Sequence, residues 1–303
     1  MRTAYLGTTD FAATVLRALA GGEHRPALVV TPPDSRAGRG RRLVPPPAAV
    51  AARELGLDLH QTADVNDSGS VERLREVAPE AVAVCAFGQL IAELLLEEMS
   101  MLNVHPSLIP RWRGAAPIER AIMMGDERTG VTIMRVTAEL DSGPVALQEE
   151  LRIGEDEGFE RLSARLARMG GRLLGAALVR LERGELELTE QDESAASYAE
   201  KIAPEERRLD PARPAIELER KVRAFNPHIG TYVELADGDR LGVRRARAVD
   251  DGPAQGEISE RDGALLLGCS TGALDLLRLQ PPGGRPMEAA DFLRGHEIPS
   301  RSS

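Results

Sequence analysis

The segment Ala81-Val82-Ala83-Val84-Cys85-Ala86-Phe87 is an unbroken run of seven apolar residues. A strand with one solvent-facing side alternates apolar and polar residues, whereas a strand covered on both faces is apolar throughout. The run is too short for a bilayer span, which needs about 18–20 apolar residues, and no other run in the sequence approaches that length. We therefore expect a buried strand of a mostly parallel sheet.

Short apolar runs alternate with helical patterns on both sides of this segment. The pattern predicts strands at residues 4–6, 27–31, 57–60, 102–105 and 131–136. It predicts helices from about Phe11, over 50–55, over 71–78 and over 118–123, where apolar residues recur at helical spacing. Such alternation is typical of an α/β domain with a mostly parallel sheet.

A change of pattern divides the chain into two parts. A long amphipathic helix from Phe159 to beyond Leu173 closes the first part, and residues 184–197 are then polar, acidic and without periodicity. After Pro204, one helix precedes five short strands between glycine turns, at residues 231–235, 241–249, 256–260, 264–269 and 273–279. Five short strands so closely spaced suggest a small β-barrel. We predict a first domain of residues 1–183, a linker of residues 184–203 and a second domain of residues 204–303.

The composition is that of an ordinary globular protein. The 303 residues are 42% apolar, 28% charged and 3% aromatic. The chain begins Met1-Arg2, and its first apolar run breaks at Gly7, too early for a signal peptide. The two cysteines lie in apolar surroundings, which argues against a disulfide scaffold or a zinc module. We expect a cytoplasmic protein without a membrane segment.

Basic charge is concentrated in one place. The net charge is −10, yet the segment from Ser35 to Arg53 carries five arginines and no acidic residue. Its first part, Arg36-Ala37-Gly38-Arg39-Gly40-Arg41-Arg42, is followed by three prolines. Such a loop can wrap phosphate groups of a polyanion, and it can equally be a solvated surface loop.

The polar residues best suited to chemistry follow the strand at 102–105. Asn103 and His105 are two positions apart, so both side chains project from the same face of that strand. An amide N–H beside an imidazole suits acyl transfer, because the amide stabilises an oxyanion and the imidazole handles a proton or a charge. The pair is also compatible with a structural role, as polar residues hydrogen-bonded to the next loop.

Asp141-Ser142-Gly143 follows the strand at 131–136 and is a second candidate. A carboxylate there could reach the histidine and favour the imidazolium. Asp and Ser are also common turn formers, so the motif taken alone is better explained as a turn.

Other familiar chemistries are not supported. Gly7-Thr8-Thr9-Asp10-Phe11 has one glycine where dinucleotide binding needs several, so Thr9 or Asp10 is better explained as a helix N-cap. The remaining histidines lack metal-ligand spacing, and we expect no metal. Cys85 lies within the buried-strand pattern, which favours packing over nucleophilic catalysis.

The motif Asn103-Val104-His105-Pro106-Ser107-Leu108-Ile109-Pro110, continuing Arg111-Trp112-Arg113-Gly114-Ala115-Ala116-Pro117-Ile118, closely resembles the signature of the 10-formyltetrahydrofolate-dependent formyltransferases. Thr129-Gly130-Val131-Thr132-Ile133-Met134 and Leu140-Asp141-Ser142-Gly143 are similar to further motifs of that family. The resemblance to the family's tRNA-specific member extends over nearly the whole chain.

This resemblance implies a Rossmann-like formyltransferase fold followed by an OB-fold-like barrel. It implies that Asn103, His105 and Asp141 form the catalytic trio, with 10-formyltetrahydrofolate as formyl donor and no metal. The implied acceptor is the free amino group of methionyl initiator tRNA. Folate contacts are implied for two segments: Phe87, Gly88, Gln89, Leu90, Ser107, Leu108, Ile109 and Pro110. Contacts to the tRNA acceptor stem are implied for the basic loop: Arg36, Arg39, Arg41 and Arg42.

Four alternatives share parts of this pattern. A formyltransferase could act on a sugar nucleotide or on a purine precursor, and a hydrolase would use the same trio with water as acceptor. A non-catalytic RNA-binding protein on the same scaffold is the fourth. The arginine loop favours tRNA over the small acceptors, and the intact trio favours an enzyme over a binding protein. We expect a monomer.

Overall fold

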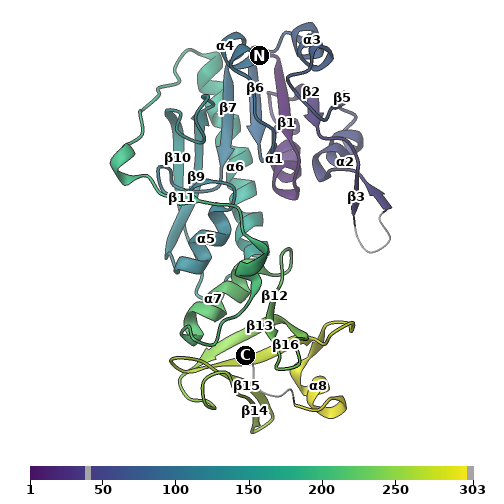
Figure 1. Cartoon of the computed structure of the whole chain (residues 1–303). Helices are drawn as coiled ribbons and strands as arrows, with labels where there is room; N and C mark the ends of the chain where they lie inside the picture. The colour runs from purple at the N-terminus through teal and green to yellow at the C-terminus, as the bar shows by residue number, and fades with distance from the viewer. Residues whose placement is uncertain (38–41, 299–303) are drawn as a thin grey trace. The chain divides into compact units, whose positions relative to one another are not determined.

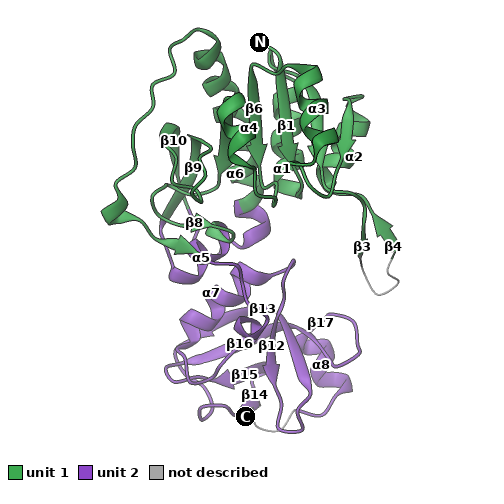
Figure 2. Ribbon diagram, turned by 45° about the horizontal axis from the view of Figure 1, so that its top comes forward, with its two compact units in different colours: residues 1–117, 128–152, 163–199 green, residues 118–127, 153–162, 200–303 purple. Residues whose placement is uncertain are grey.

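The computed structural model describes residues 1–37 and 42–298, which form two compact units (Figure 2). Unit 1 comprises Met1–Pro117, Arg128–Arg152 and Ser163–Ala199. Unit 2 comprises Ile118–Glu127, Ile153–Leu162 and the chain from Glu200 onward. The chain therefore passes between the units more than once, although the domains predicted from sequence are each continuous.

Unit 1 is built on a seven-stranded sheet in the order β10-β9-β7-β6-β1-β2-β5 (Figure 1). Its strands are β1 (Thr3–Gly7), β2 (Pro26–Thr31), β5 (Leu59–Gln61), β6 (Ala81–Cys85), β7 (Met101–His105), β9 (Arg128–Arg135) and β10 (Val145–Arg152). All neighbours from β7 to β5 are parallel, whereas β9 is antiparallel to β7 and to β10. The predicted mostly parallel sheet is confirmed, and β6 lies inside it with every residue buried.

Helices cover both faces of this sheet, which explains the apolar strands. They are α1 (Asp10–Ala20), α2 (Pro47–Glu54), α3 (Ser68–Val77), α4 (Glu93–Glu98) and α6 (Phe159–Glu182). Ala4 and Leu6 of β1 belong to one core cluster with residues of α3 and α4. Tyr5 lies between them and points the other way, where its hydroxyl donates to the carbonyl of Ala12 in α1 at 2.6 Å. Thr9 is the N-cap of α1, as expected, and accepts a hydrogen bond from Ala12 N.

Several structured segments of unit 1 were not expected from the sequence, and two of them are strand pairings. One is β10, an edge strand whose two consecutive glutamates obscure any alternation of apolar and polar residues. The other is a short hairpin of β3 (Ser35–Ala37) and β4 (Arg42–Val44) within the predicted basic loop. β10 is mostly polar after Leu147, and each strand of the hairpin has only three residues, so local periodicity does not reveal them.

The segment interpreted as a linker is bound along unit 1 as far as Ala199. Val145 and Thr189 exchange backbone hydrogen bonds, and β11 (Tyr198–Ala199) pairs in parallel with β8 (Arg113–Gly114). Between them lies a 3₁₀ turn, η1 (Glu193–Ala195). We refer to residues 184–199 as the strap. Its polar composition reflects side chains that bind unit 1 rather than an unattached connection.

Unit 2 contains an antiparallel sheet in the order β12-β13-β16-β15-β14, with β17 paired to β16. Its strands are β12 (Thr231–Glu234), β13 (Arg240–Val249), β14 (Ile258–Arg261), β15 (Ala264–Gly268), β16 (Ala273–Gln280) and β17 (Met287–Glu288). Each of the five predicted strands is present. Within the described residues, the terminal strands β12 and β14 are not paired with each other, so the sheet is open on that side.

Helices pack on this second sheet and complete its core. Unit 2 contains α5 (Pro117–Met124) from Ile118 on, the 3₁₀ turn η2 (Pro204–Arg207), α7 (Ala215–Phe225) and α8 (Ala289–Gly295). Leu218 and Val222 of α7 and Phe292 of α8 share a buried cluster with apolar residues of the sheet. Over residues 1–37 and 42–298, no helix combines the length and the apolar character needed to cross a membrane.

Two glycines of α6 provide a test of its packing. A Cβ at Gly171 would lie 2.5 Å from the Cβ of Ala18 in α1, whereas a Cβ at Gly175 would meet nothing within 4 Å in the described chain. Gly171→Ala should therefore destabilise the protein by about 1–3 kcal/mol through overpacking. Gly175→Ala should stabilise it by about 0.5–1 kcal/mol, because alanine favours the helix. Urea unfolding of both variants measures the difference, and equal effects would contradict this packing.

Candidate active site

Asn103 and His105 lie at the carboxyl end of β7 and point to the same side of the sheet. Val104, between them, is buried on the opposite side, where it packs near Gly170 of α6. Pairing with β9 fixes the register, because Asn103 lies opposite Met134 and His105 opposite Thr132. The two-residue spacing thus delivers the shared orientation predicted from the sequence.

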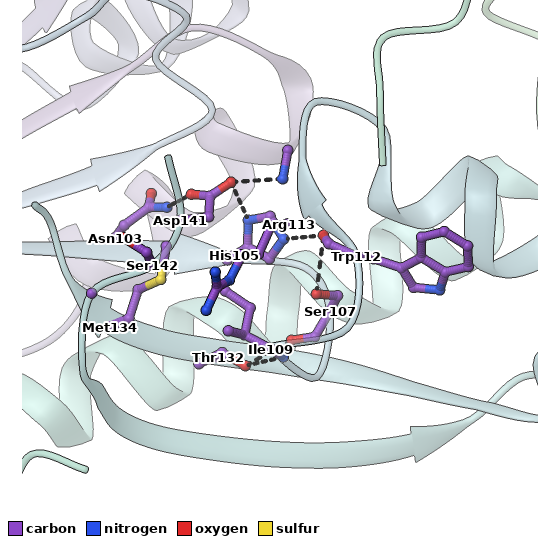
Figure 3. A network of polar contacts seen from close by, with 12 residues as sticks. Asn103, His105, Ser107, Ile109, Trp112, Arg113, Thr132, Met134, Asp141 and Ser142 are labelled. Carbon is purple, nitrogen blue, oxygen red and sulfur yellow. Dashed lines mark hydrogen bonds and ion pairs between the residues drawn. The ribbon is translucent and has the colours of Figure 1, made fainter. Parts of the chain in front are cut away.

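The carboxylate of Asp141 joins these two side chains (Figure 3). Its Oδ1 accepts a hydrogen bond from Asn103 Nδ2 at 3.3 Å, and its Oδ2 lies 3.5 Å from His105 Nδ1. The backbone N–H of Gly114 also donates to Oδ2, at 2.8 Å. The structure therefore brings the three predicted residues into contact, in a turn where Asp141 itself has a positive φ of 49°. Both earlier interpretations of Asp141 hold, since it forms the turn and reaches the histidine.

His105 is only 4% exposed, and both its ring nitrogens face oxygen atoms. Nδ1 faces the Asp141 carboxylate, while Nε2 lies 2.8 Å from the backbone carbonyl oxygen of Trp112. A neutral imidazole donates from one nitrogen only, whereas the imidazolium donates from both. Each ring nitrogen of His105 therefore has an oxygen acceptor beside it, as Figure 3 shows.

The segment Ser107–Pro110 is held in place by a buried threonine. The hydroxyl of Thr132 donates to the carbonyl of Ser107 at 2.7 Å and accepts from Ile109 N and from the amide of Gln148. Ser107 and Ile109 are buried, while Leu108 and Pro110 are half-buried. A ligand can therefore meet this predicted folate segment through Leu108, Pro110 and the backbone.

The other predicted folate segment, Phe87–Leu90, follows β6 and so lies beside the carboxyl end of β7. The Phe87 ring is buried in the core, and the backbone carbonyl of Phe87 accepts from the hydroxyl of Thr8 at 2.7 Å. The Gln89 side chain is used internally, because it accepts from Val65 N and donates to the carbonyl of Thr62. Gly88 has a positive φ of 80°, and Leu90 is 86% exposed. The ring of Phe87 is thus not presented to a ligand, whereas the Leu90 side chain is.

Two of the four predicted basic-loop residues are described. Arg36 on β3 and Arg42 on β4 are exposed, whereas Arg39 and Arg41 lie outside the described residues. Arg36 is opposite Leu43, and Arg42 is opposite Ala37. Consecutive residues on a strand point to opposite faces, so Arg36 and Arg42 project from different sides of the hairpin.

The residues that bind the Asp141 turn, beyond Asn103 and His105, were not predicted from the sequence. Arg113 is 2% exposed and binds the Oε1 of Gln191 and the carboxylate of Glu193, both on the strap. The hydrogen bond from Arg113 lowers the pKa of the Glu193 carboxyl. Arg113 lies inside the quoted motif, but nothing in the polar strap distinguishes Gln191 or Glu193 from its neighbours.

Other candidates for a reactive group are a metal-ligating cluster and the buried cysteine of β6. Within residues 1–37 and 42–298, no three metal-ligating side chains come together. Burial raises the pKa of the Cys85 thiol to about 12, and a thiol that stays protonated is a poor nucleophile. The packing role expected for Cys85 agrees with its complete burial in β6.

Comparisons with known proteins agree with this geometry. Residues 1–178 match the formyl transferase family, and residues 201–297 match the formyl transferase C-terminal domain. The methionyl-tRNA formyltransferase of Methylococcus capsulatus is 41% identical over 302 residues, which cover 98% of each chain. That of Methylobacillus flagellatus is 40% identical over 301 residues, covering 98% of this chain and 97% of the relative.

Solved structures of lower identity share the fold. HypX from Aquifex aeolicus, in complex with tetrahydrofolic acid, aligns with a TM-score of 0.64 and 19% identity over 99% of this chain and 50% of its own. WlaRD, a sugar 3N-formyl transferase, aligns with a TM-score of 0.65 and 13% identity over 90% of this chain and 96% of its own. The architecture of this chain is therefore shared with both of these solved structures.

Two threonines of β9 test how the Ser107–Pro110 segment is held. Thr132→Val removes the hydroxyl that binds Ser107 and Ile109, and the buried groups left without partners should cost about 1–3 kcal/mol of unfolding free energy. Thr129 is the matched control, because its buried Oγ1 has no hydrogen-bond partner among the described residues. Thr129→Val should be neutral or stabilising. Denaturant titration measures the unfolding free energy of both variants. A Thr132→Val variant as stable as wild type would contradict the anchoring role of Thr132.

Proposed function

The chain belongs to the formyl transferase family, and we propose that Asn103, His105 and Asp141 catalyse its reaction, formyl transfer to the free amino group of methionyl initiator tRNA. The observation that carries the proposal is the contact of one carboxylate with both the Asn103 amide and the His105 ring. The full-length relatives named methionyl-tRNA formyltransferase favour this acceptor over a sugar nucleotide, a purine precursor or water. The family's donors are formyl-tetrahydrofolates, and we propose the 10-formyl isomer.

The proposed reaction is a direct transfer without a covalent enzyme intermediate. The methionine nitrogen attacks the formyl carbon and forms a new C–N bond, and the carbonyl oxygen becomes an oxyanion. Collapse of this tetrahedral species breaks the bond between the formyl carbon and the folate nitrogen. The attacking nitrogen loses a proton and the leaving nitrogen gains one, so the net reaction exchanges a formyl group for a hydrogen.

Asn103 and His105 are the proposed donors to the oxyanion. The amide nitrogen of Asn103 carries two hydrogens, and Asp141 takes one of them, so the second is left for the substrate. His105 reaches the oxyanion by exchanging the carbonyl of Trp112, which is neutral, for an oxygen that carries charge. Hydrogen bonds to charged acceptors are stronger, so this exchange favours the transition state. Asp141 stays behind the ring and stabilises its positive charge.

Folate is proposed to bind at the carboxyl ends of β6 and β7, where ligands of open α/β sheets bind. The contacts we propose come from the backbone of Phe87, Gly88 and Gln89, from the exposed Leu90, and from Ser107, Leu108, Ile109 and Pro110. Support comes from the adjacency of the two strands, which pair at Val84 and Asn103. The donor's formyl group would then lie next to the trio.

The acceptor tRNA is proposed to contact the basic hairpin through Arg36, Arg39, Arg41 and Arg42. Phosphate contacts by arginine are the usual source of sequence-independent affinity for nucleic acids. A confined basic region also explains how a chain of net charge −10 binds a polyanion. We further propose that the protein is a monomer and acts in the cytoplasm.

The proposed trio predicts a specific loss of activity. His105→Ala and Asn103→Ala should each lower kcat for formyl transfer by about 10²–10³-fold, because each removes a donor to the oxyanion. His60→Ala is the control, since His60 binds Ser70 in the same unit but away from the trio. Transfer from 10-formyltetrahydrofolate to methionyl initiator tRNA is the assay. Wild-type transfer to water or a sugar nucleotide, but not to this tRNA, would overturn the acceptor.

The basic hairpin predicts a substrate-selective effect. Replacing Arg39 and Arg41 with alanine should raise the KM for tRNA, leave the KM for folate unchanged, and reduce the slope of log affinity against log salt by about 2. Arg172→Ala serves as a matched control, because Arg172 is an exposed arginine of α6 paired with Glu149. An equal rise of both KM values would rule out the hairpin as the tRNA contact.

A further inference from the structure

The turn that carries Asp141 requires external support. A non-glycine residue at a φ of 49° is in the left-handed region, which costs about 1–2 kcal/mol. Such a conformation persists only where surrounding contacts fix it. Gly143 closes the same turn so tightly against β9 that a Cβ there would lie 1.9 Å from the carbonyl oxygen of Arg135.

The side chain of Gln191 binds this turn at two points. Its Nε2 donates to the backbone carbonyl of Asp141 at 3.0 Å and to that of Gly143 at 2.7 Å. Its Oε1 accepts from Nε and Nη2 of Arg113 at 3.0 and 2.7 Å. Both hydrogens and both lone pairs of the amide are therefore used, and only one orientation of the amide satisfies all four bonds.

Arg113 fixes the other end of this connection. The guanidinium is buried and binds both oxygens of Glu193 at 2.7 and 2.8 Å, so the strap holds it from two residues. The next residue, Gly114, donates its N–H to the Asp141 carboxylate. The two-residue strand β8 thus contacts Asp141 in two ways. Gly114 binds its carboxylate directly, and Arg113 binds Gln191, which in turn binds its backbone carbonyl.

We infer that Gln191 is a positioning residue for the reaction: it fixes the backbone of the Asp141 turn so that the carboxylate meets both Asn103 and His105. This rests on the proposed function of the trio. Gln191 binds the backbone of the turn, not the catalytic side chains, so it acts on the reaction through Asp141. A displacement of the carboxylate weakens its contacts with both donors together, and catalytic geometry tolerates little displacement.

Gln191→Glu is the discriminating variant. The new carboxylate still accepts from Arg113, but it has no hydrogen to donate and places negative charge against the carbonyls of Asp141 and Gly143. Glu193→Gln is the matched control, because it alters the same arginine cluster without touching the turn. Thermal unfolding of both variants reports any general loss of structure.

We expect Gln191→Glu to lower kcat by about 10–100-fold with both KM values within twofold of wild type. Its pH profile of kcat should be displaced relative to wild type, because the charge facing His105 has moved. Glu193→Gln should keep kcat within about threefold and leave the pH profile in place. Equal kcat losses in the two variants, or a loss in Gln191→Glu with an unmoved pH profile, would overturn the positioning role.

The same variants separate this inference from the proposed acceptor. If wild-type enzyme transfers no formyl group to methionyl initiator tRNA, the proposed function fails, and the comparison is then made with whichever acceptor is active. If wild type is active on the tRNA and Gln191→Glu matches it in kcat, the inference alone fails. Gln191→Met, which lacks both donor and acceptor, should lower kcat at least as much as Gln191→Glu, and wild-type kcat in this variant would also contradict the inference.

Discussion

The carboxylate of Asp141 is the interaction on which the site depends. It contacts Asn103, His105 and the N–H of Gly114, which come from the end of β7 and from β8. Without this carboxylate, the Asn103 amide and the His105 ring would have no common partner, and their relative orientation would be set by the strand alone. One half-buried carboxylate therefore orients both side chains.

The fold supplies the place for this interaction. The parallel order of β7, β6 and β1 brings the loops after these strands to one edge of the sheet, which is where ligands bind in open α/β folds. β9 runs antiparallel to β7 and ends opposite Leu102, and the chain after it turns so that Asp141 contacts Asn103 and His105. The strap closes the arrangement from outside, through Arg113 and Gln191. The strand β7 determines the positions of Asn103 and His105, and the strap supports the position of the Asp141 turn.

The sequence predicted those parts whose signal is local. The apolar run at β6, the alternation of strands and helices and the spacing of Asn103 and His105 all follow from short-range periodicity. For Asp141 the residues alone favoured a turn over a carboxylate that reaches the histidine, and the family resemblance favoured the second. Gln191 was missed because its partners are distant in sequence. β10 was missed because polar residues interrupt its apolar pattern, although its partner β9 is the preceding strand. The contacts of the predicted linker with unit 1 were not foreseen, because Glu193, which binds the buried Arg113, resembles a solvated acidic residue in the sequence.

The most direct test of this account is a double-mutant cycle on single-turnover formyl transfer with His105→Ala, Asp141→Ala and the double variant. Asp141 is proposed to act through both His105 and Asn103, so the double variant should lose much less activity than the product of the two single losses. Groups that work as a unit show such strong non-additivity. If the two losses instead multiply, Asp141 and His105 act independently, and the carboxylate does not have the central role assigned to it.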